Sequence, residues 1–263
     1  MSEAFEVQTS DGICLRGERG GDGPSLVFSN SLGVTREMWR DQQEALSADY
    51  HVILYDTRGH GVSDAPPGGY SIDRLTLDVI EVLDALGVEE THFCGLSLGG
   101  MTGQALAVRA PERLQSLTLA ATSSYMGPPG GWQNRIDTVL SSGMEPIVDA
   151  VLQKWFAEEG SVEQMVAIAA KGWLLETNPV GYAGCCAAIR DMDLRSMVTA
   201  IDIETLVLAG KNDQATPIDH ATFLQSHING ASLTSMAGGH LLNLEQPTLF
   251  TKSVRNFLGE LGR

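Results

Sequence analysis

The chain has 263 residues, 43% of them hydrophobic, so it can bury a large core in one or two domains. Its 33 acidic against 17 basic residues give a net charge of −16, which opposes binding to nucleic acid or anionic membranes. No apolar run reaches about 18 residues and no secretory signal is recognisable, so we expect a cytoplasmic protein without a membrane span. The four cysteines lack metal-type spacing and are expected to be buried thiols.

Strand and helix patterns alternate through the first half of the chain. Residues 5–8 and 13–18 alternate in polarity around Ser10-Asp11-Gly12, which predicts an antiparallel hairpin. Further strands are predicted at 26–29, 51–56, 91–94 and 114–121, with helices at about 36–47, 72–86 and 99–110 between them. This alternation predicts a mostly parallel, doubly wound sheet.

The alternation stops between about residues 123 and 202. No strand pattern occurs there, apolar residues recur with helical spacing from Ile147 to Phe156, and Asn178-Pro179 is typical of a helix start. Strands at 205–209 and 232–236 and helices at 217–228 and 247–258 then resume the earlier order. We therefore predict an α/β core, residues 1–122 and 203–263, with a helical cap inserted at 123–202.

The stretch THFCGLSLGGM, residues 91–101, predicts a strand, a tight turn and a helix with Ser97 at the apex. Gly95 and Gly99 stand where larger side chains would collide with the neighbouring backbone. Ser97 is therefore expected at the exposed edge of the sheet, as a nucleophile. The alternative is a glycine-rich turn with an idle serine, because the bare G-x-S-x-G pattern also arises by chance.

A nucleophilic serine needs a base, and the base needs an orienting acid. His240 follows the last predicted strand in AGGH, and Asp213 follows the strand 205–209 in GKND. Both positions lie at the same sheet edge as Ser97, and their chain order, serine, acid, histidine, is that of a known triad arrangement. His60 precedes the serine, so we expect a structural hydrogen-bonding role for it. The alternative for Asp213 is a solvated turn residue that caps the next helix.

Stabilising an oxyanion requires backbone N–H donors. The residue after the nucleophile, Leu98, supplies one at the start of a helix. The second is expected from the loop after strand 26–29, by chain position from Leu32 or from Ser31.

These motifs resemble the α/β-hydrolase fold, and more closely the 3-oxoadipate enol-lactonase family. GLSLGG, GKND and GGH point to the superfamily, while SNSLG, DTRGHGVSDAP, FCGLSLGGMTGQ and GYAGCCAAIRDMDLR are more specific. The resemblance covers almost the whole chain and implies hydrolysis of the enol-lactone of the bacterial 3-oxoadipate pathway, without cofactor or metal. Ser31-Leu32 stands where many other hydrolases have a His-Gly pair, which leaves the second oxyanion donor open.

The substrate that this resemblance implies is a small lactone with a carboxylate, which must enter a protein of net charge −16. We therefore expect a local cation, either Arg135 or Arg190; the alternative is that each pairs with a nearby aspartate. Trp132 and Trp155 are candidates for the pocket wall, or for ordinary core. A general carboxylesterase or perhydrolase, and a receptor that keeps the triad, remain alternatives. No sequence pattern predicts the oligomeric state.

Overall fold

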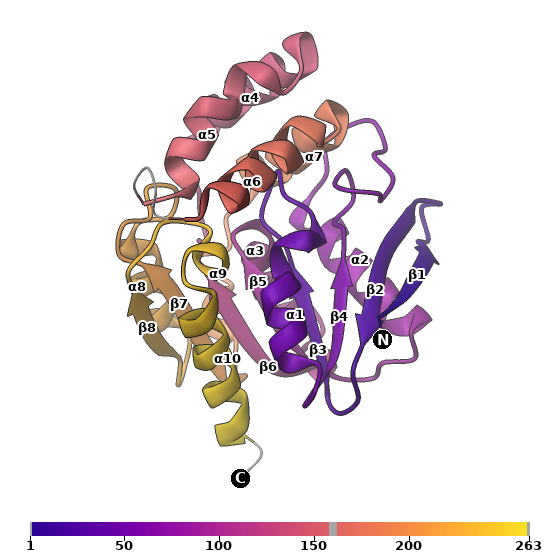
Figure 1. Ribbon diagram of the computed structural model, residues 1–263, viewed down its shortest axis with the longest axis vertical. Helices are drawn as coiled ribbons and strands as arrows, with labels where there is room; N and C mark the ends of the chain where they lie inside the picture. Colours follow the sequence, from indigo (N-terminus) through magenta and orange to yellow (C-terminus); the bar gives the residue numbers. More distant parts are fainter. Residues whose placement is uncertain (1, 158–161, 262–263) are drawn as a thin grey trace.

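The computed structural model describes residues 2–157 and 162–261, and in these ranges an eight-stranded sheet forms the centre of the molecule (Figure 1). The strand order is β1-β2-β4-β3-β5-β6-β7-β8. The strands are β1 (Glu3–Gln8), β2 (Cys14–Gly20), β3 (Ser25–Ser29), β4 (His51–Tyr55), β5 (Thr91–Leu96), β6 (Leu114–Ala120), β7 (Thr205–Gly210) and β8 (Ser232–Met236). Only the pairs β1–β2 and β2–β4 are antiparallel, so the predicted, mostly parallel sheet is confirmed.

Helices cover both faces of this sheet. In Figure 1, α1 (Arg40–Leu46) and α10 (Pro247–Leu261) lie in front of the strands, and α2 (Ile72–Ala85) and α3 (Leu98–Arg109) lie behind them. The remaining helices of the core are α8 (Ile218–His227), α9 (Leu242–Glu245) and the 3-10 turns η1 (Arg36–Trp39), η2 (Pro111–Arg113) and η4 (Val198–Ala200). The helix predicted at 36–47 is therefore two elements, η1 followed by α1.

Local sequence explains the ends of α2. The Ser71 hydroxyl accepts the Arg74 N–H at 3.1 Å, which satisfies one of the donors left unpaired at a helix start. Two residues past the helix, Gly87 adopts φ 68°, a conformation that glycine takes without strain. On the opposite face of the sheet, the Trp39 ring packs at a tilt against Phe28 and Phe250, with ring centroids 4.8 and 5.8 Å away, which fastens η1 and α10 to β3.

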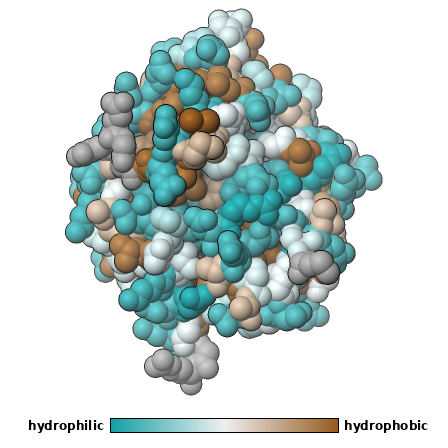
Figure 2. Space-filling view, in the orientation of Figure 1, coloured by the Kyte–Doolittle hydropathy of each residue, from teal (hydrophilic) through white to brown (hydrophobic). Residues whose placement is uncertain are grey.

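Among the described residues, four α-helices lie between β6 and β7 in the chain: α4 (Pro129–Ser142), α5 (Val148–Trp155), α6 (Gln164–Glu176) and α7 (Pro179–Asp191), together with the 3-10 turns η3 (Glu145–Ile147) and η4. We call α4 to α7 the cap helices, because they stand above the upper edge of the sheet in Figure 1. Exposed apolar side chains include Leu140 on α4 and Met165 and Ile168 on α6. Figure 2 shows hydrophobic surface in the upper part of the molecule, where these helices lie.

Cys94, Cys185 and Cys186 are buried free thiols, as expected, whereas Cys14 at the start of β2 is partly exposed. Cys14 differs because it opens a strand near the sheet edge, outside the main core. Within the described residues, no helix is both long and apolar enough to cross a membrane.

Candidate active site

Ser97 occupies the turn between the end of β5 and the start of α3. Its backbone has φ 56° and ψ −112°, which is uncommon for a residue with a side chain. A Cβ on Gly95 would lie 2.2 Å from the Gly99 carbonyl oxygen, and one on Gly99 would lie 2.1 Å from that of Ser29. Both flanking glycines are thus required for the turn to pack this closely, and the turn projects the serine from the end of the strand.

Asp213 and His240 meet on the loops that follow the adjacent parallel strands β7 and β8. His240 Nδ1 lies 2.9 Å from Asp213 Oδ2. Asp213 also accepts the Ala215 and Thr216 N–H groups at 2.8 and 2.9 Å and the Thr216 hydroxyl at 2.7 Å. Because the carboxylate can only accept, Nδ1 carries the proton, and Nε2 of the neutral ring is left as the basic nitrogen.

Electrostatics keep this carboxylate ionised. Burial by itself raises the pKa of Asp213, but the charge and hydrogen bond of His240 and the Thr216 donors lower it more, so the pKa lies below its ordinary value. Asp213 therefore orients the imidazole as an anion, and the alternative of a merely solvated turn residue does not fit its 5% exposure.

Backbone hydrogen bonds join the histidine loop to the cap. The carbonyl of Trp155, at the end of α5, accepts the N–H groups of His240 at 2.8 Å and Leu241 at 3.0 Å. Glu245 contacts both sides of this junction, since its carboxylate accepts the Gly239 N–H and, at 2.9 Å, the Ala157 N–H. The position of His240 consequently depends on where α5 ends.

Ser97 and His240 line one pocket beneath the cap helices, which encloses about 460 Å³ of empty space with its open mouth included. The lining residues are Ser31, Leu32, Ser97, Met101, Met126, Trp132, Arg135, Val151, Lys154, Trp155, Tyr182, Ile189, Ala215 and His240. No carboxylate is among these described residues, so the wall carries the positive charges of Arg135 and Lys154 despite the acidic chain.

The two arginines proposed from the sequence have different surroundings. Arg135 lines the pocket, lies 5.0 Å from the centre of the Trp132 ring and donates to the Tyr182 hydroxyl at 3.4 Å. Arg190 instead forms a two-bond pair with Asp191, at 2.7 and 2.6 Å, and does not line the described pocket wall. Of these two arginines, only Arg135 therefore presents its charge to this pocket.

Both predicted oxyanion donors are near the serine. Leu98 is the first residue of α3, where backbone N–H groups have no partner within the helix. Leu32 and Ser31 both line the pocket, so the structure leaves the second donor open between them.

The sequence of this chain is similar to those of known hydrolases. Residues 24–247 match the family model of the alpha/beta hydrolase fold. The chain belongs to the α/β-hydrolase family. This α/β hydrolase is 40% identical to 3-oxoadipate enol-lactonase 2 of Acinetobacter baylyi over 89% of its own length and 88% of the relative. It is thus a hydrolase related to the enol-lactonases.

Solved structures of hydrolases have the same fold as this protein. The enol-lactonase from Burkholderia xenovorans LB400 matches this hydrolase with a TM-score of 0.94 and 36% identity, covering 97% of this chain and 100% of the other. A thermophilic esterase from Thermogutta terrifontis matches with a TM-score of 0.93 and 25% identity, covering 98% and 99%. The same architecture therefore serves lactones and esters among its relatives.

Sequence reasoning missed several residues of the hydrolase's pocket. Lys154 lies beside Trp155 on a helix whose apolar spacing was visible, but nothing in that spacing tells which polar side chain turns toward the serine. Tyr182 and Ile189 belong to an apolar stripe on α7 that is typical of core, and both also touch the pocket. The contact of Glu245 with the Ala157 N–H could not be found, because these two residues lie 88 positions apart in the chain.

Proposed function

We propose that this protein hydrolyses the enol-lactone of 3-oxoadipate with Ser97, His240 and Asp213 as a catalytic triad. The observation that carries the proposal is the hydrogen bond between His240 and the buried carboxylate of Asp213. His240 lines the same pocket as Ser97, which lies on a turn with positive φ. The two enol-lactonases reported above support the choice of substrate.

In the first half of the reaction, Ser97 Oγ attacks the lactone carbonyl while His240 Nε2 takes the hydroxyl proton. The N–H groups of Leu98 and Leu32 stabilise the resulting oxyanion. The ring C–O bond then breaks, and the leaving enolate oxygen receives the proton from His240. An enolate leaves more easily than an alkoxide, and its conversion to the ketone opposes reclosure of the ring.

In the second half, water attacks the acyl group on Ser97. His240 takes one proton from the water and returns it to Ser97 Oγ as the ester bond breaks, so the carboxylic acid product is released and the triad is restored. No cofactor takes part in either half.

Arg135 is the residue that we assign to the substrate carboxylate. Its guanidinium lines the pocket, and its contacts among the described residues are a tyrosine hydroxyl and a tryptophan face instead of an acidic partner. A guanidinium can grip a carboxylate through two parallel N–H donors. Trp132 and Trp155 form apolar parts of the wall, and Lys154 adds a second positive charge.

The test compares Arg135→Met with Arg190→Met on two substrates, the enol-lactone and the uncharged ester 4-nitrophenyl acetate. Arg135→Met removes one partner of a desolvated charge pair, which should raise the free energy of the transition state for the enol-lactone by roughly 2 to 5 kcal/mol. Its kcat/KM for the enol-lactone should fall by the corresponding factor. Its ester hydrolysis should stay close to wild type, and Arg190→Met should behave as wild type on both substrates.

Equal losses of Arg135→Met on the lactone and the ester would show that the arginine only supports the cap. A wild-type protein that turns over the ester but not the enol-lactone would favour the second candidate, a general carboxylesterase. That candidate is supported by the Thermogutta esterase and by the largely apolar pocket wall.

A further inference from the structure

The loop that follows β4 contacts the loop that carries the proposed oxyanion donor. The Gly33 N–H donates to His60 Nε2 at 2.9 Å, and His60 Nδ1 lies 3.2 Å from the Arg58 carbonyl oxygen. A carbonyl oxygen only accepts, so Nδ1 carries the ring proton and Nε2 offers a lone pair to Gly33. His60 is thus held as one neutral tautomer, with both ring nitrogens in use.

The surroundings of His60 keep it in this state. The side chain is 1% exposed, and burial lowers its pKa to about 4, since a charged imidazolium is unfavourable there. A protonated ring would point a second N–H at the N–H of Gly33, and this hydrogen bond would be lost. His60 does not line the described pocket, so it has no role in transferring protons to the substrate.

Gly33 sits at a point where the backbone has little freedom. It adopts φ 82°, and a Cβ there would lie 2.7 Å from Leu174 Cδ1 and 3.1 Å from the Tyr182 ring of the cap helices. The turn is therefore enclosed by the cap on one side and His60 on the other. Three residues earlier, Asn30 fixes the same turn from within, because its amide donates to the Val34 carbonyl at 2.8 Å.

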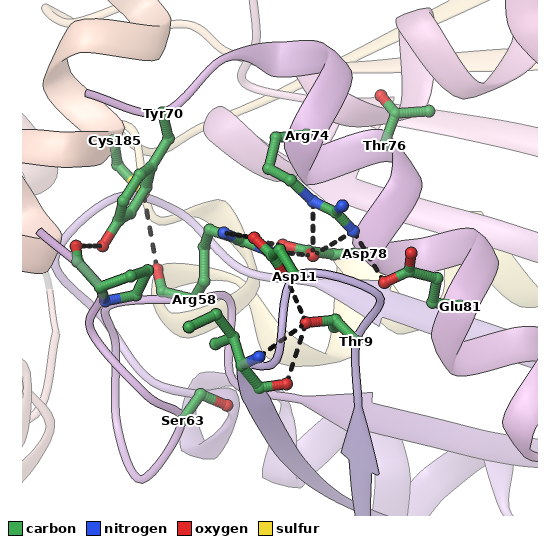
Figure 3. A network of polar contacts seen from close by, with 12 residues as sticks. Thr9, Asp11, Arg58, Ser63, Tyr70, Arg74, Thr76, Asp78, Glu81 and Cys185 are labelled. Atoms are coloured by element: carbon green, nitrogen blue, oxygen red, sulfur yellow. Dashed lines mark hydrogen bonds and ion pairs between the residues drawn. The ribbon is translucent and has the colours of Figure 1, made fainter. Parts of the chain in front are cut away.

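The loop that presents His60 is itself fixed by a buried ionic network (Figure 3). The Arg58 guanidinium donates to both Asp78 oxygens at 2.6 Å and to Asp11 at 2.9 Å, and it lies 5.5 Å from the centre of the Tyr70 ring. The hydrogen bond from Arg58 helps to lower the pKa of Asp11 to about 2. The two acidic partners come from the first hairpin and from α2, so the peptide that accepts from His60 is held by the core.

We infer that His60 is a positioning residue for the hydrolysis reaction: by accepting the Gly33 N–H, it fixes the turn that presents the neighbouring Leu32 N–H to the oxyanion. The inference rests on the proposed function, in which Leu32 is the second donor. An oxyanion donor contributes only when it is held at the right place before charge develops. A rigid acceptor one peptide away provides that constraint.

Two substitutions separate this role from packing. In His60→Gln, the carbonyl oxygen of the longer amide reaches about as far as Nε2 and can accept the Gly33 N–H, whereas the shorter amide in His60→Asn reaches only the Arg58 carbonyl. Both are compared with wild type on 4-nitrophenyl acetate, so the result does not depend on the lactone assignment. Thermal melts check that each variant is folded.

We expect His60→Asn to lower kcat by about 10- to 100-fold, part of the loss seen when an oxyanion donor is removed, with KM within about twofold. Inhibition by phenylboronic acid, which forms a tetrahedral adduct with a serine, should weaken by a similar factor. His60→Gln should restore kcat to within about threefold of wild type. If His60→Asn does not fold, His60→Met takes its place, because its thioether is nearly as long as glutamine and a much weaker acceptor.

Equal kcat values for the Gln variant and its non-accepting counterpart would overturn the inference, as would a loss confined to KM. A wild-type protein inert toward both the ester and the lactone would overturn the proposed function itself. An active wild type with indifferent His60 variants would overturn only the positioning role.

Discussion

At the scale of single residues, the site depends on groups that act as one unit. Ser97→Ala and His240→Ala should each reduce kcat by ~10⁶-fold, because attack by the serine and proton transfer to the histidine belong to one step. The double variant should be little worse than either single one. Single-turnover assays of all three proteins with 4-nitrophenyl acetate check this, and losses that multiply would contradict a common catalytic unit.

Asp213 acts through His240, so its removal should cost less. Asp213→Asn should lower kcat by on the order of 10⁴-fold, because the amide stabilises the wrong imidazole tautomer. In the wild type, the pKa of Asp213 lies below its ordinary value, so this carboxylate stays ionised above about pH 4. Steady-state assays with 4-nitrophenyl acetate measure kcat of the variant, and full activity would assign the orienting acid elsewhere.

At the scale of elements, the cap depends on one close approach of backbones. A Cβ on Gly181 of α7 would lie 2.2 Å from Gly59 Cα, so Gly181→Ala must displace the helix from the loop that carries His60. We expect a loss of roughly 1 to 3 kcal/mol in the free energy of unfolding, with reduced kcat. Urea unfolding and ester hydrolysis measure the two effects.

The matched control is Gly172→Ala on α6, where nothing lies within 4 Å of the added Cβ. Alanine favours a helix interior over glycine, so this variant should gain up to about 1 kcal/mol and keep full activity. Equal behaviour of the two variants would mean that the Gly59–Gly181 contact does not hold the cap.

The elements that the sequence predicted well were those whose pattern is local. The strands, α2 and the turn at Ser97 have clear periodicity or glycine spacing, and the structure has them within a few residues. The start of α4 was hidden, because Pro128-Pro129-Gly130-Gly131 is typical of a loop. The sequence did not indicate a start for α6 either, because the apolar residues of this helix lie on all of its faces instead of forming one stripe.

The same distinction applies within the candidate site. Asp213 and His240 were found because each follows a strand at the edge where parallel strands end together. The hydrogen bond of His60 to Gly33 and the ion pairs of Arg58 join residues 20 to 47 positions apart, and no local pattern encodes such partners. Which arginine faces the pocket was likewise decided by the packing of α4 on α7.

At the scale of the whole molecule, His60 makes stability depend on pH. Its folded pKa of about 4 lies below the ordinary 6.5, so between these values the unfolded chain binds more protons. The contribution of His60 to the free energy of unfolding is fully present above about pH 6.5. It decreases as the pH falls toward 4, by on the order of 3 kcal/mol in total. Urea unfolding from pH 7.5 to 4 measures the slope.

Burial lowers the pKa of His51, His92 and His220 as well, so their contributions must be subtracted. His60→Gln provides the control, because it keeps those histidines and removes only the group in question. The variant should unfold with a visibly smaller dependence on pH, and an unchanged slope would assign the acid sensitivity elsewhere.

The strand order has a consequence for how the molecule is assembled in time. Ser97 lies at the end of the central strand β5, whereas Asp213 and His240 follow β7 and β8. These two strands come after the cap helices in the chain, so a long segment separates them from the strands beside which they pair. Closing so long a loop is entropically costly and slow for parallel strands. A refolding chain should regain helical circular dichroism before hydrolysis, and the delay would time the docking of the last two strands.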